Sequence, residues 1–249
     1  MKDKNRKTAL IIGAGSDMAV SIAKEYAGNG YDLILAARDM GAIDPIASDL
    51  AIRHPGAEIR KAALDVLKME THRGFYEGLD PKPDVAICVV GYLGDQELAQ
   101  SDSGEFRKIT DTNYTGCASL LNVIAGEFER RGSGTIIGVS SVAGDRGRKS
   151  NYVYGSAKAA FTSYLSGLRH RLADKGVRVI TVKPGFVNTR MTEGMDLPPA
   201  LTASPEEVAR DIFKAHRRAC DVIYTKWFWR YIMLIIRHLP ERIFKKTSL

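Results

Sequence analysis

The sequence predicts an α/β protein built on one doubly wound parallel sheet of about seven strands, with helices on both faces. Short, almost continuously apolar runs alternate along the chain with longer segments whose apolar residues recur at helical spacing. The runs lack the alternating polar positions of half-exposed strands, which is typical of parallel strands covered on both faces. At 249 residues, the chain is also long enough to form such a sheet as a single domain.

Each expected strand is a run of β-branched or aliphatic residues. The strands are expected at 8–15, 31–38, 58–66, 84–91, 134–141, 177–185 and 221–224. The helices are expected at 17–29, 40–53, 68–78, 103–109, 111–130, 152–174 and 205–218. Strands and helices in this alternation define a Rossmann-type sheet. No internal repeat or linker divides the chain, so we expect residues 1–225 to form one domain and residues 226–249 to form its basic, amphipathic tail.

The charge and cysteine content exclude several classes of function. The net charge of +7 is concentrated in "MKDKNRK" at the start and "RHLPERIFKK" near the end, not in the stripe typical of a nucleic-acid binder. The cysteines Cys88, Cys117 and Cys220 are too scattered for a disulfide framework or a metal site. The first 12 residues do not form a secretory signal. We therefore expect a cytoplasmic protein with no bound metal and no nucleic-acid partner.

A phosphate-binding turn is predicted where the first strand meets the first helix, in "IIGAGSDMA". Gly13 and Gly15 let the backbone approach a phosphate, and a helix that starts near Ser16 or Asp17 offers free N–H groups. Met18 occupies the third glycine position of the usual G-x-G-x-x-G pattern. Taken alone, the motif has a second interpretation, a tight turn before a helix.

The tip of the second predicted strand bears on the choice of dinucleotide. The segment "AARD" places Arg38 and Asp39 roughly 20 residues after the glycines, where the adenosine ribose of a dinucleotide lies. An arginine there accommodates the 2′-phosphate of NADP(H), whereas a carboxylate accepts the 2′-hydroxyl of NAD(H). Arg38 therefore favours NADP(H), and Asp39 keeps NAD(H) as the alternative.

The segment "SNYVYGSAKAAF" contains a candidate acid and its partner. Tyr154 and Lys158 share one helix face, one turn apart. A free phenol has a pKa of about 10 and is a poor acid at neutral pH, but a neighbouring ammonium favours the phenolate. The pair is therefore predicted to transfer a proton. Tyr152 has no lysine four residues later, so Tyr154 is preferred, although such pairs also occur on ordinary helices.

The order and spacing of the motifs along the chain, to about residue 225, resemble those of the short-chain dehydrogenase/reductase family. The resemblance rests on "IIGAGSDMA", "LDV", "CVVGYLG", "TDTNYTG", "VSSVAG", "YGSAK" and "KPGFVNTRM". It implies a catalytic set of Asn113, Ser141, Tyr154 and Lys158. Ser141 would polarise a carbonyl for hydride attack, and Lys158 would reach a ribose hydroxyl. Asn113 would hold a water that links Lys158 to solvent.

The resemblance also extends the predicted cofactor site. It implies that Asp65 and Val66 lie beside the adenine, and that the stretch ending in Thr189 lies over the nicotinamide. The full predicted set is Gly13, Gly15, Ser16, Asp17, Met18, Arg38, Asp65, Val66, Gly91, Tyr154, Lys158, Pro184, Gly185, Val187 and Thr189. The spacing to Tyr154 favours Ser141 over its neighbour Ser140.

Two kinds of position depart from the family pattern. Asp17 and Ala19 stand where glycines are usual, and only Gly91 remains of the usual N-N-A-G. Ala19 differs little from glycine in size. The absence of the N-N-A-G asparagines is expected to cost a structural hydrogen bond but not the chemistry. The carboxylate of Asp17 would repel a pyrophosphate unless it turns away, so we expect it to cap the helix N–H groups.

The segment "KWFWRYIMLIIRHLPERIFKKTSL" (226–249) is the unusual part of the chain. Its apolar run, 227–236, is too short to span a bilayer but, with the cations that follow, is typical of an anchor on an anionic membrane surface. The alternative is a helix packed over the active site or against a partner subunit. The tail is similar to that of family members that reduce decaprenylphosphoryl-2-keto-erythro-pentose, a lipid-linked ketosugar.

We therefore expect an NADP(H)-dependent oxidoreductase that reduces a ketone to an alcohol, or the reverse, on a lipid-linked ketosugar or another amphipathic carbonyl compound. Its tail would hold it at the inner face of the membrane. The alternatives are a soluble 3-oxoacyl or small-ketone reductase and a non-catalytic NAD(P)-binding sensor. The segment 194–207 is expected to form a mobile lid. The resemblance implies a homodimer or homotetramer built on the helices at 111–130 and 152–174.

Overall fold

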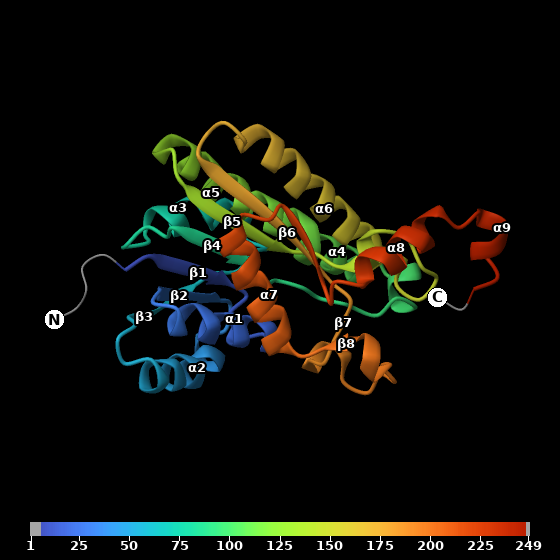
Figure 1. The fold of residues 1–249 in the computed structure, drawn as a ribbon, viewed down its shortest axis with the longest axis horizontal. Coiled ribbons are helices and arrows are strands. Elements are labelled where there is room, and N and C mark those ends of the chain that lie inside the picture. The colour runs from blue at the N-terminus through green and yellow to red at the C-terminus, as the bar shows by residue number, and fades with distance from the viewer. Residues whose placement is uncertain (1–5, 248–249) are drawn as a thin grey trace.

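The computed structural model describes residues 6–247 and contains a seven-stranded parallel sheet of order β3-β2-β1-β4-β5-β6-β9 (Figure 1). The strands are β1 (Thr8–Ile12), β2 (Asp32–Ala37), β3 (Ile59–Ala63), β4 (Val85–Cys88), β5 (Gly134–Val139), β6 (Val177–Pro184) and β9 (Val222–Thr225). Every neighbouring pair is parallel. The predicted doubly wound sheet is confirmed.

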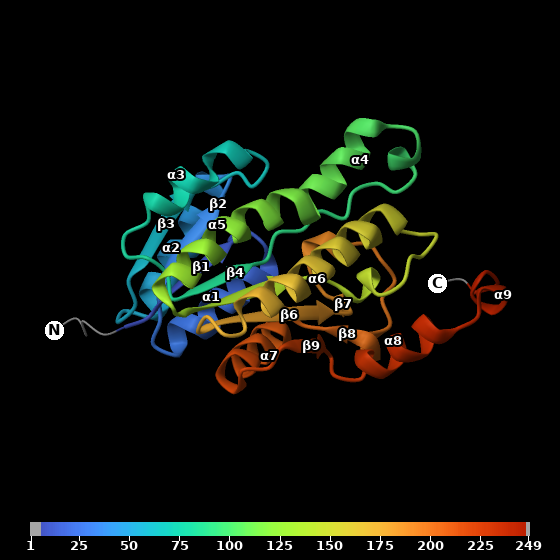
Figure 2. The ribbon, with the colours of Figure 1, turned by 90° about the horizontal axis from the view of Figure 1, so that it is seen from above.

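Helices cover both faces of this sheet (Figures 1 and 2). One face carries α1 (Asp17–Gly28), α2 (Met40–Arg53) and α7 (Pro205–Arg218). The other carries α3 (His72–Glu77), α5 (Gly116–Arg131) and α6 (Tyr152–Leu172). Helix α4 (Ser103–Thr110) runs into α5 through one π-helical turn, Asp111–Thr115. These helices lie close to the predicted ranges because their amphipathic periods are long and regular.

Two hydrophobic layers explain why central strands such as β1 are almost wholly apolar, whereas the edge strand β3 contains Arg60 and Lys61. In β1, Ala9 and Ile11 belong to the layer under α1 and α7, whereas Leu10 and Ile12 belong to the layer under α5 and α6. All four side chains are fully buried. Because successive strand residues point to opposite faces, a strand covered on both sides has no position left for a polar side chain.

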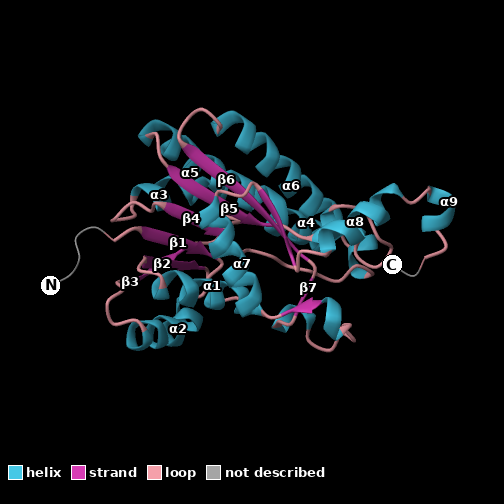
Figure 3. Cartoon of the chain, viewed as in Figure 1, coloured by secondary structure: helices cyan, strands magenta, loops and turns pink. Residues whose placement is uncertain are grey.

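Several details depart from the sequence prediction. A second sheet pairs β7 (Phe186–Val187) with β8 (Thr202–Ala203), and β7 lies apart from the central sheet (Figure 3). Strands of two residues are too short to produce a periodic pattern. The basic residues at 1–5 and the last two residues of the predicted tail lie outside the described residues.

The tail continues as α8 (Trp229–His238) and α9 (Glu241–Phe244), at the end of the molecule where the strands finish (Figure 2). One face of α8 buries Trp229, Met233 and Ile236. The guanidinium of Arg146 donates to the carbonyls of Ile236 and Leu239, both at 2.7 Å, and so caps the end of α8. No helix in the described part of the chain is long and apolar enough to cross a membrane.

The packing of α7 on α1 includes a buried histidine. His216 Nδ1 lies 3.0 Å from the hydroxyl of Tyr26, and the two rings stack at 5.7 Å. Burial, with added repulsion from neighbouring cations such as Arg178, lowers the pKa of His216 to about 4. The folded chain therefore holds this histidine neutral, whereas an unfolded chain protonates it below about pH 6.5.

This shift predicts a pH-dependent loss of stability. Because the folded pKa of His216 is lowered, its contribution is present above pH 6.5 and is lost as the pH falls toward 4. Between pH 7 and pH 4, the free energy of unfolding of the wild-type chain should fall by on the order of 2 kcal/mol more than that of His216→Gln. Urea titrations at several pH values measure this, and equal pH slopes in the two proteins would contradict it.

Candidate active site

Three adjoining cavities follow the carboxyl ends of the strands from β3 to β6. The first, of about 400 Å³, lies at the ends of β1, β2 and β3. The second, of about 320 Å³, begins where β4 and β5 end. The third, of about 140 Å³, lies at the end of β6. The carboxyl ends of parallel strands are where doubly wound sheets bind ligands. A larger cavity of about 540 Å³, between α7 and β9, contains none of the predicted site residues.

Nearly all the predicted site residues line these three cavities. The predicted residues that line the first are Gly13, Gly15, Ser16, Arg38, Asp65, Val66 and Gly91. Those that line the second are Gly15, Ser16, Asp17, Met18, Gly91, Tyr154, Lys158 and Thr189. Those that line the third are Met18, Ser141, Tyr154, Pro184, Gly185, Val187 and Thr189. Shared residues at each boundary show that the cavities form one trough across the sheet.

The glycine turn is shaped by close contact with Val90, just beyond the end of β4. Gly13 has a φ of +85°, and a Cβ there would lie 3.1 Å from the side chain of Val90. Its N–H donates to the carbonyl of Ala36 at 2.9 Å, so the turn is tied to β2 as well. Ser16 then caps α1, because its Oγ accepts from the N–H of Ala19 at 3.3 Å. Glycine therefore supplies the positive φ and the close approach to Val90 that this tight turn requires.

The prediction that Asp17 caps α1 is wrong. Ser16 is the cap, and Asp17 instead binds a residue 173 positions later. Its carboxylate accepts from the backbone N–H of Arg190 at 2.8 Å and from Arg190 Nε at 3.0 Å. Arg190 also donates to the carbonyl of Gly15 at 2.5 Å. The arginine neutralises the charge that would otherwise repel a pyrophosphate, and no local sequence pattern could reveal this contact.

Arg38 and Asp39 differ in whether they are already engaged. In the part of the chain that the structure describes, Arg38 has no hydrogen-bond or ion-pair partner, and it lines the first cavity. The carboxylate of Asp39 accepts from the N–H of Ala42 at 3.1 Å and so caps α2. Lys108, which the sequence analysis missed, lines the same cavity and adds a second cation. The open cation and the occupied carboxylate fit a 2′-phosphate better than a 2′-hydroxyl.

The Tyr154–Lys158 pair lies at the centre of the trough. The amine of Lys158 is buried and donates to the carbonyls of Val90 and Val139, both at 3.2 Å. It lies 5.8 Å from the centre of the Tyr154 ring. Tyr154 lines both the second and the third cavity, whereas Tyr152 is 44% exposed and lines neither. Of the two tyrosines, only Tyr154 therefore lines the trough, and its role as the acid stays a prediction.

The two serines after β5 have different partners. Ser140 Oγ is buried and bonds to the carbonyl of Lys158 at 3.0 Å and to Thr162 Oγ1 at 2.7 Å, which ties β5 to α6. Ser141 Oγ accepts from the N–H of Ala143 at 3.1 Å and lines the third cavity. Because Ser141 only accepts in that bond, its hydroxyl hydrogen is free to be donated into the cavity.

Asn113 lies in the π-helical turn and lines none of the three cavities. Its amide nitrogen donates to the carbonyls of Tyr92 and Ile109 at 2.6 and 2.8 Å, and its oxygen accepts from the Tyr92 N–H at 3.1 Å. A Cβ on Gly91 would lie 3.6 Å from Asn113 Oδ1 and 3.7 Å from Lys158 Nζ. Asn113 therefore holds the loop after β4 beside the lysine, and its predicted water remains a prediction.

The loop after β6 is covered by the tail. A Cβ on Gly185 would lie 1.9 Å from the indole nitrogen of Trp229, so no other residue fits there. That indole N–H donates to the carbonyl of Leu201 at 3.1 Å, and its ring packs edge-on against Phe186 at 5.5 Å. The packed alternative for the tail is therefore correct for the inner face of α8, which forms part of the wall behind the third cavity.

These features fit a dinucleotide and give no sign of a metal centre. The glycine turn lines the first cavity, Arg38 has no partner there among the described residues, and the N-terminus of α1 lines the second cavity. Among residues 6–247, no group of three or more His, Cys, Asp or Glu side chains could hold a metal ion. The fold and the trough are those of a Rossmann-type nucleotide-binding protein.

Comparisons with known proteins agree with this class. A family model described as short chain dehydrogenase matches residues 7–198. An uncharacterized oxidoreductase of Mycobacterium tuberculosis is 33% identical over 99% of both chains. A short-chain dehydrogenase from Sphingobium yanoikuyae, solved in complex with NADPH, has a TM-score of 0.80 at 21% identity, covering 94% of this chain and 97% of the other. The bulky-bulky ketone specific alcohol dehydrogenase from Comamonas testosteroni has a TM-score of 0.79 at 22% identity, covering 96% of each chain.

The chain therefore belongs to the short-chain dehydrogenase/reductase family of NAD(P)-dependent oxidoreductases. The family resemblance drawn from the sequence motifs is confirmed. At 21% and 22% identity, the two solved structures show only that the fold is shared.

The Asp17–Arg190 pair predicts a specific pattern of cofactor affinities. Arg190→Ala leaves the carboxylate of Asp17 uncompensated beside the phosphate turn, so the Kd for NADPH should rise about tenfold. Asp17→Asn alone should bind NADPH nearly as the wild type does, and Asp17→Asn combined with Arg190→Ala should recover most of the lost affinity. Fluorescence titration measures all four proteins. If the double variant binds as weakly as Arg190→Ala, compensation of Asp17 is not the role of Arg190.

Proposed function

We propose that the protein is an NADP(H)-dependent oxidoreductase that reduces a ketone to an alcohol, or catalyses the reverse reaction, with Tyr154 as the general acid. One observation carries the proposal. Tyr154 stands at the boundary of the second and third cavities, with the ammonium of Lys158 behind it and Ser141 in the third cavity. A carbonyl oxygen in the third cavity would meet two hydroxyl donors, one of them beside a fixed cation.

The proposed roles follow from the position of each side chain. NADP(H), when bound, supplies or accepts the hydride. Ser141 donates its hydroxyl hydrogen to the carbonyl oxygen and stabilises the charge that develops there. Tyr154 transfers its phenolic proton to that oxygen. The ammonium of Lys158 stabilises the phenolate that remains, and Asn113 keeps the loop beside it in place.

Two observations support NADP(H) over NAD(H). Arg38 has no partner in the first cavity among residues 6–247, whereas the carboxylate of Asp39 already caps α2. The Sphingobium relative in the comparison was solved with NADPH, which agrees with this choice.

If Tyr154 is the general acid, its replacement should lower NADPH oxidation without changing NADPH affinity. Tyr154→Phe removes the transferable proton and leaves the trough intact, so NADPH oxidation should fall by about 100-fold or more with NADPH affinity unchanged. Ethyl acetoacetate and dihydroxyacetone serve as test ketones, and Tyr152→Phe is the matched control that should retain activity. Unchanged oxidation in Tyr154→Phe would refute its role. Binding of NADPH with no oxidation in the wild-type chain would favour the sensor alternative.

If Arg38 binds the 2′-phosphate of NADP(H), its removal should affect the affinity for NADPH and not that for NADH. Arg38→Ala should weaken NADPH binding by about tenfold and leave NADH binding unchanged, because only the 2′-phosphate loses its partner. Fluorescence titrations with both cofactors measure this, with Arg53→Ala on the exposed end of α2 as the control. Tighter binding of NADH than of NADPH by the wild-type chain would contradict selection of NADP(H) by Arg38 and favour the NAD-linked alternative.

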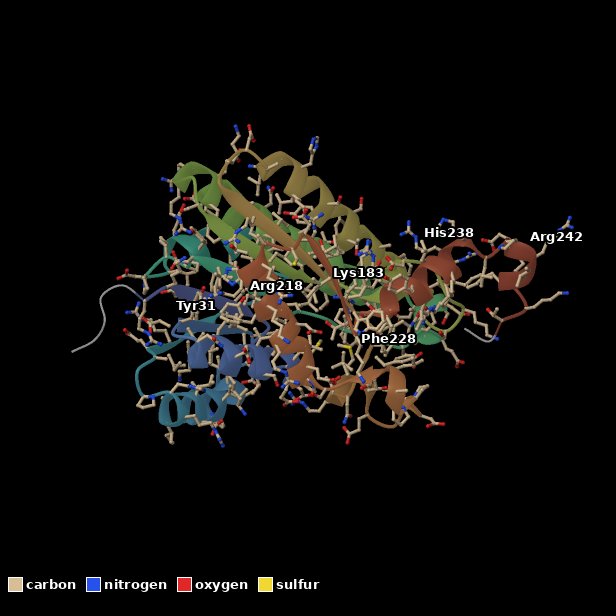
Figure 4. All side chains as sticks on the ribbon, in the orientation of Figure 1. Tyr31, Lys183, Arg218, Phe228, His238 and Arg242 are labelled. Atoms are coloured by element: carbon tan, nitrogen blue, oxygen red, sulfur yellow. The ribbon has the colours of Figure 1, made fainter. Side chains whose placement is uncertain are left out.

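The outer face of the tail supports an amphipathic substrate reached at an anionic membrane surface. Trp227, Tyr231, Leu234 and Ile235 are between 54 and 72% exposed, although α8 already buries its inner face. Exposed cations flank them, and Arg242 projects away from the body of the molecule (Figure 4). We propose that this face rests on the inner surface of the membrane and brings a lipid-linked ketosugar, or a similar carbonyl compound, to the trough.

A soluble small-ketone reductase is the second candidate, because the inner face of α8 packs on the chain itself. In either case, we propose that α5 and α6 form the interface of a homodimer or homotetramer, as the family resemblance implies.

Vesicle binding distinguishes the two candidates. The full-length chain should float with vesicles that contain anionic phosphatidylglycerol and not with vesicles of phosphatidylcholine alone. Combined replacement of Tyr231, Leu234 and Ile235 by serine should abolish flotation with the fold intact, because each of these residues is more than half exposed. Ile52→Ser, at an 80% exposed apolar position on α2, is the matched control and should still float. No flotation of the wild type would favour the small-ketone reductase.

A further inference from the structure

A buried arginine in the third cavity has no partner for its charge within the described part of the chain. Arg148 lies between β5 and α6 and is only 9% exposed. Its Nη2 lies 3.5 Å from the sulfur of Met233, a weak acceptor, and its Nε is buried without any hydrogen-bond partner. No carboxylate in the described residues lies within ion-pair distance of it. It lines the cavity together with Ser141 and Tyr154.

The neighbouring acid is already neutralised. Asp145 is buried and accepts from Lys183 Nζ at 2.6 Å and from the Tyr224 hydroxyl at 2.9 Å. Lys183 lies near the end of β6, beside Tyr224 of β9. One negative charge thus faces two buried cations, and an uncompensated positive charge remains on Arg148. Burial lowers the pKa of the Arg148 guanidinium, and Asp145 offsets only part of that effect. A buried charge without a partner is costly unless a ligand supplies one.

A second unpaired group comes from the same turn. The backbone N–H of Asn151 donates to the carbonyl of Arg148 at 3.1 Å, so both side chains extend from the same short turn. Asn151 Oδ1 is buried without a hydrogen-bond partner, and Asn151 also lines the third cavity. A carbonyl oxygen in this state lacks a donor, which a substrate hydroxyl could supply.

The other described residues that line the cavity are uncharged. Arg148 is the one charged residue among the described residues that line this space, and its neighbours include the apolar Val142, Phe186 and Val187. A volume of about 140 Å³ corresponds to roughly a benzene-sized group. Any anion held by Arg148 must therefore lie within a few bonds of a carbonyl at Tyr154. Met191 and Met195, both part-exposed, leave an apolar exit for the rest of a larger molecule.

We propose that the third cavity is built for a ketone that carries an anionic group, a phosphate or a carboxylate, which the guanidinium of Arg148 binds. Asn151 accepts from a hydroxyl of the same molecule. The position of the reacting carbonyl rests on the proposed reductase function, but binding of the anion does not. The planar fork of an arginine suits two-point binding of either anion, and the apolar walls strengthen the interaction.

Calorimetric titration with matched ketones tests this proposal. The full chain is saturated with NADP⁺, which fills the cofactor phosphate sites and prevents reduction, and is titrated with dihydroxyacetone phosphate, dihydroxyacetone and 4-oxopentanoate. Both anionic ketones, or one of them, should bind at least about tenfold more tightly than dihydroxyacetone. The tighter of the two identifies the anion as phosphate or carboxylate.

Three variants give the controls. Arg148→Met should remove the preference for anions, Arg148→Lys should keep part of it, and Lys149→Met, which removes an exposed charge from the same loop, should leave it unchanged. Equal affinity for charged and neutral ketones in the wild type, or equal losses in Arg148→Met and Lys149→Met, would overturn the proposal. Repeating the titration without NADP⁺ measures the anion site independently of the cofactor. Binding through Arg148 with no turnover by NADPH would overturn the reductase function and leave the anion site standing.

Discussion

The buried ammonium of Lys158 is the constraint on which the rest of the site depends. A cation in the interior needs hydrogen-bond acceptors, and the carbonyls of Val90 and Val139 provide them just beyond β4 and at the end of β5. Those two carbonyls are neighbours only because β4 and β5 run parallel and in register. Anchoring the amine there sets α6 against the sheet and places Tyr154, one helical turn earlier, over the trough.

Contacts between distant parts of the chain complete the trough. Arg190, which follows β7, reaches back to Asp17 and Gly15 and joins the loop over the second cavity to the phosphate turn. On the other side, Trp229 from the tail covers Gly185 and holds the loop after β6 from behind. The tail therefore has two distinct faces: its inner face packs behind the third cavity, and its outer face is exposed and is the surface that we propose rests on a membrane.

Much of the fold could be predicted from the sequence because its signals are local. A strand buried on both faces must be apolar throughout, and an amphipathic helix repeats its pattern over several turns, so β1 and α7 are visible in the residues alone. The features that were missed depend on distant residues. The true partner of Asp17 lies 173 positions away, the unpaired state of Arg148 depends on how Lys183 and Tyr224 surround Asp145, and β7 is only two residues long. Motif spacing identified Tyr154 and Ser141 as candidates, but only packing shows that Ser140 is used to tie β5 to α6.

The central claim is that Lys158 serves the cofactor site and the acid together. Titration of Lys158→Met with NADPH, alongside NADPH oxidation with ethyl acetoacetate and dihydroxyacetone, tests it most directly, because methionine fills the same space without the charge. We expect NADPH affinity to fall by about tenfold or more and turnover to be lost, while circular dichroism shows an unchanged fold. Exposed Lys149→Met should behave as the wild type. If Lys158→Met binds and oxidises NADPH as well as the wild type, the site is organised around another group and the account is wrong.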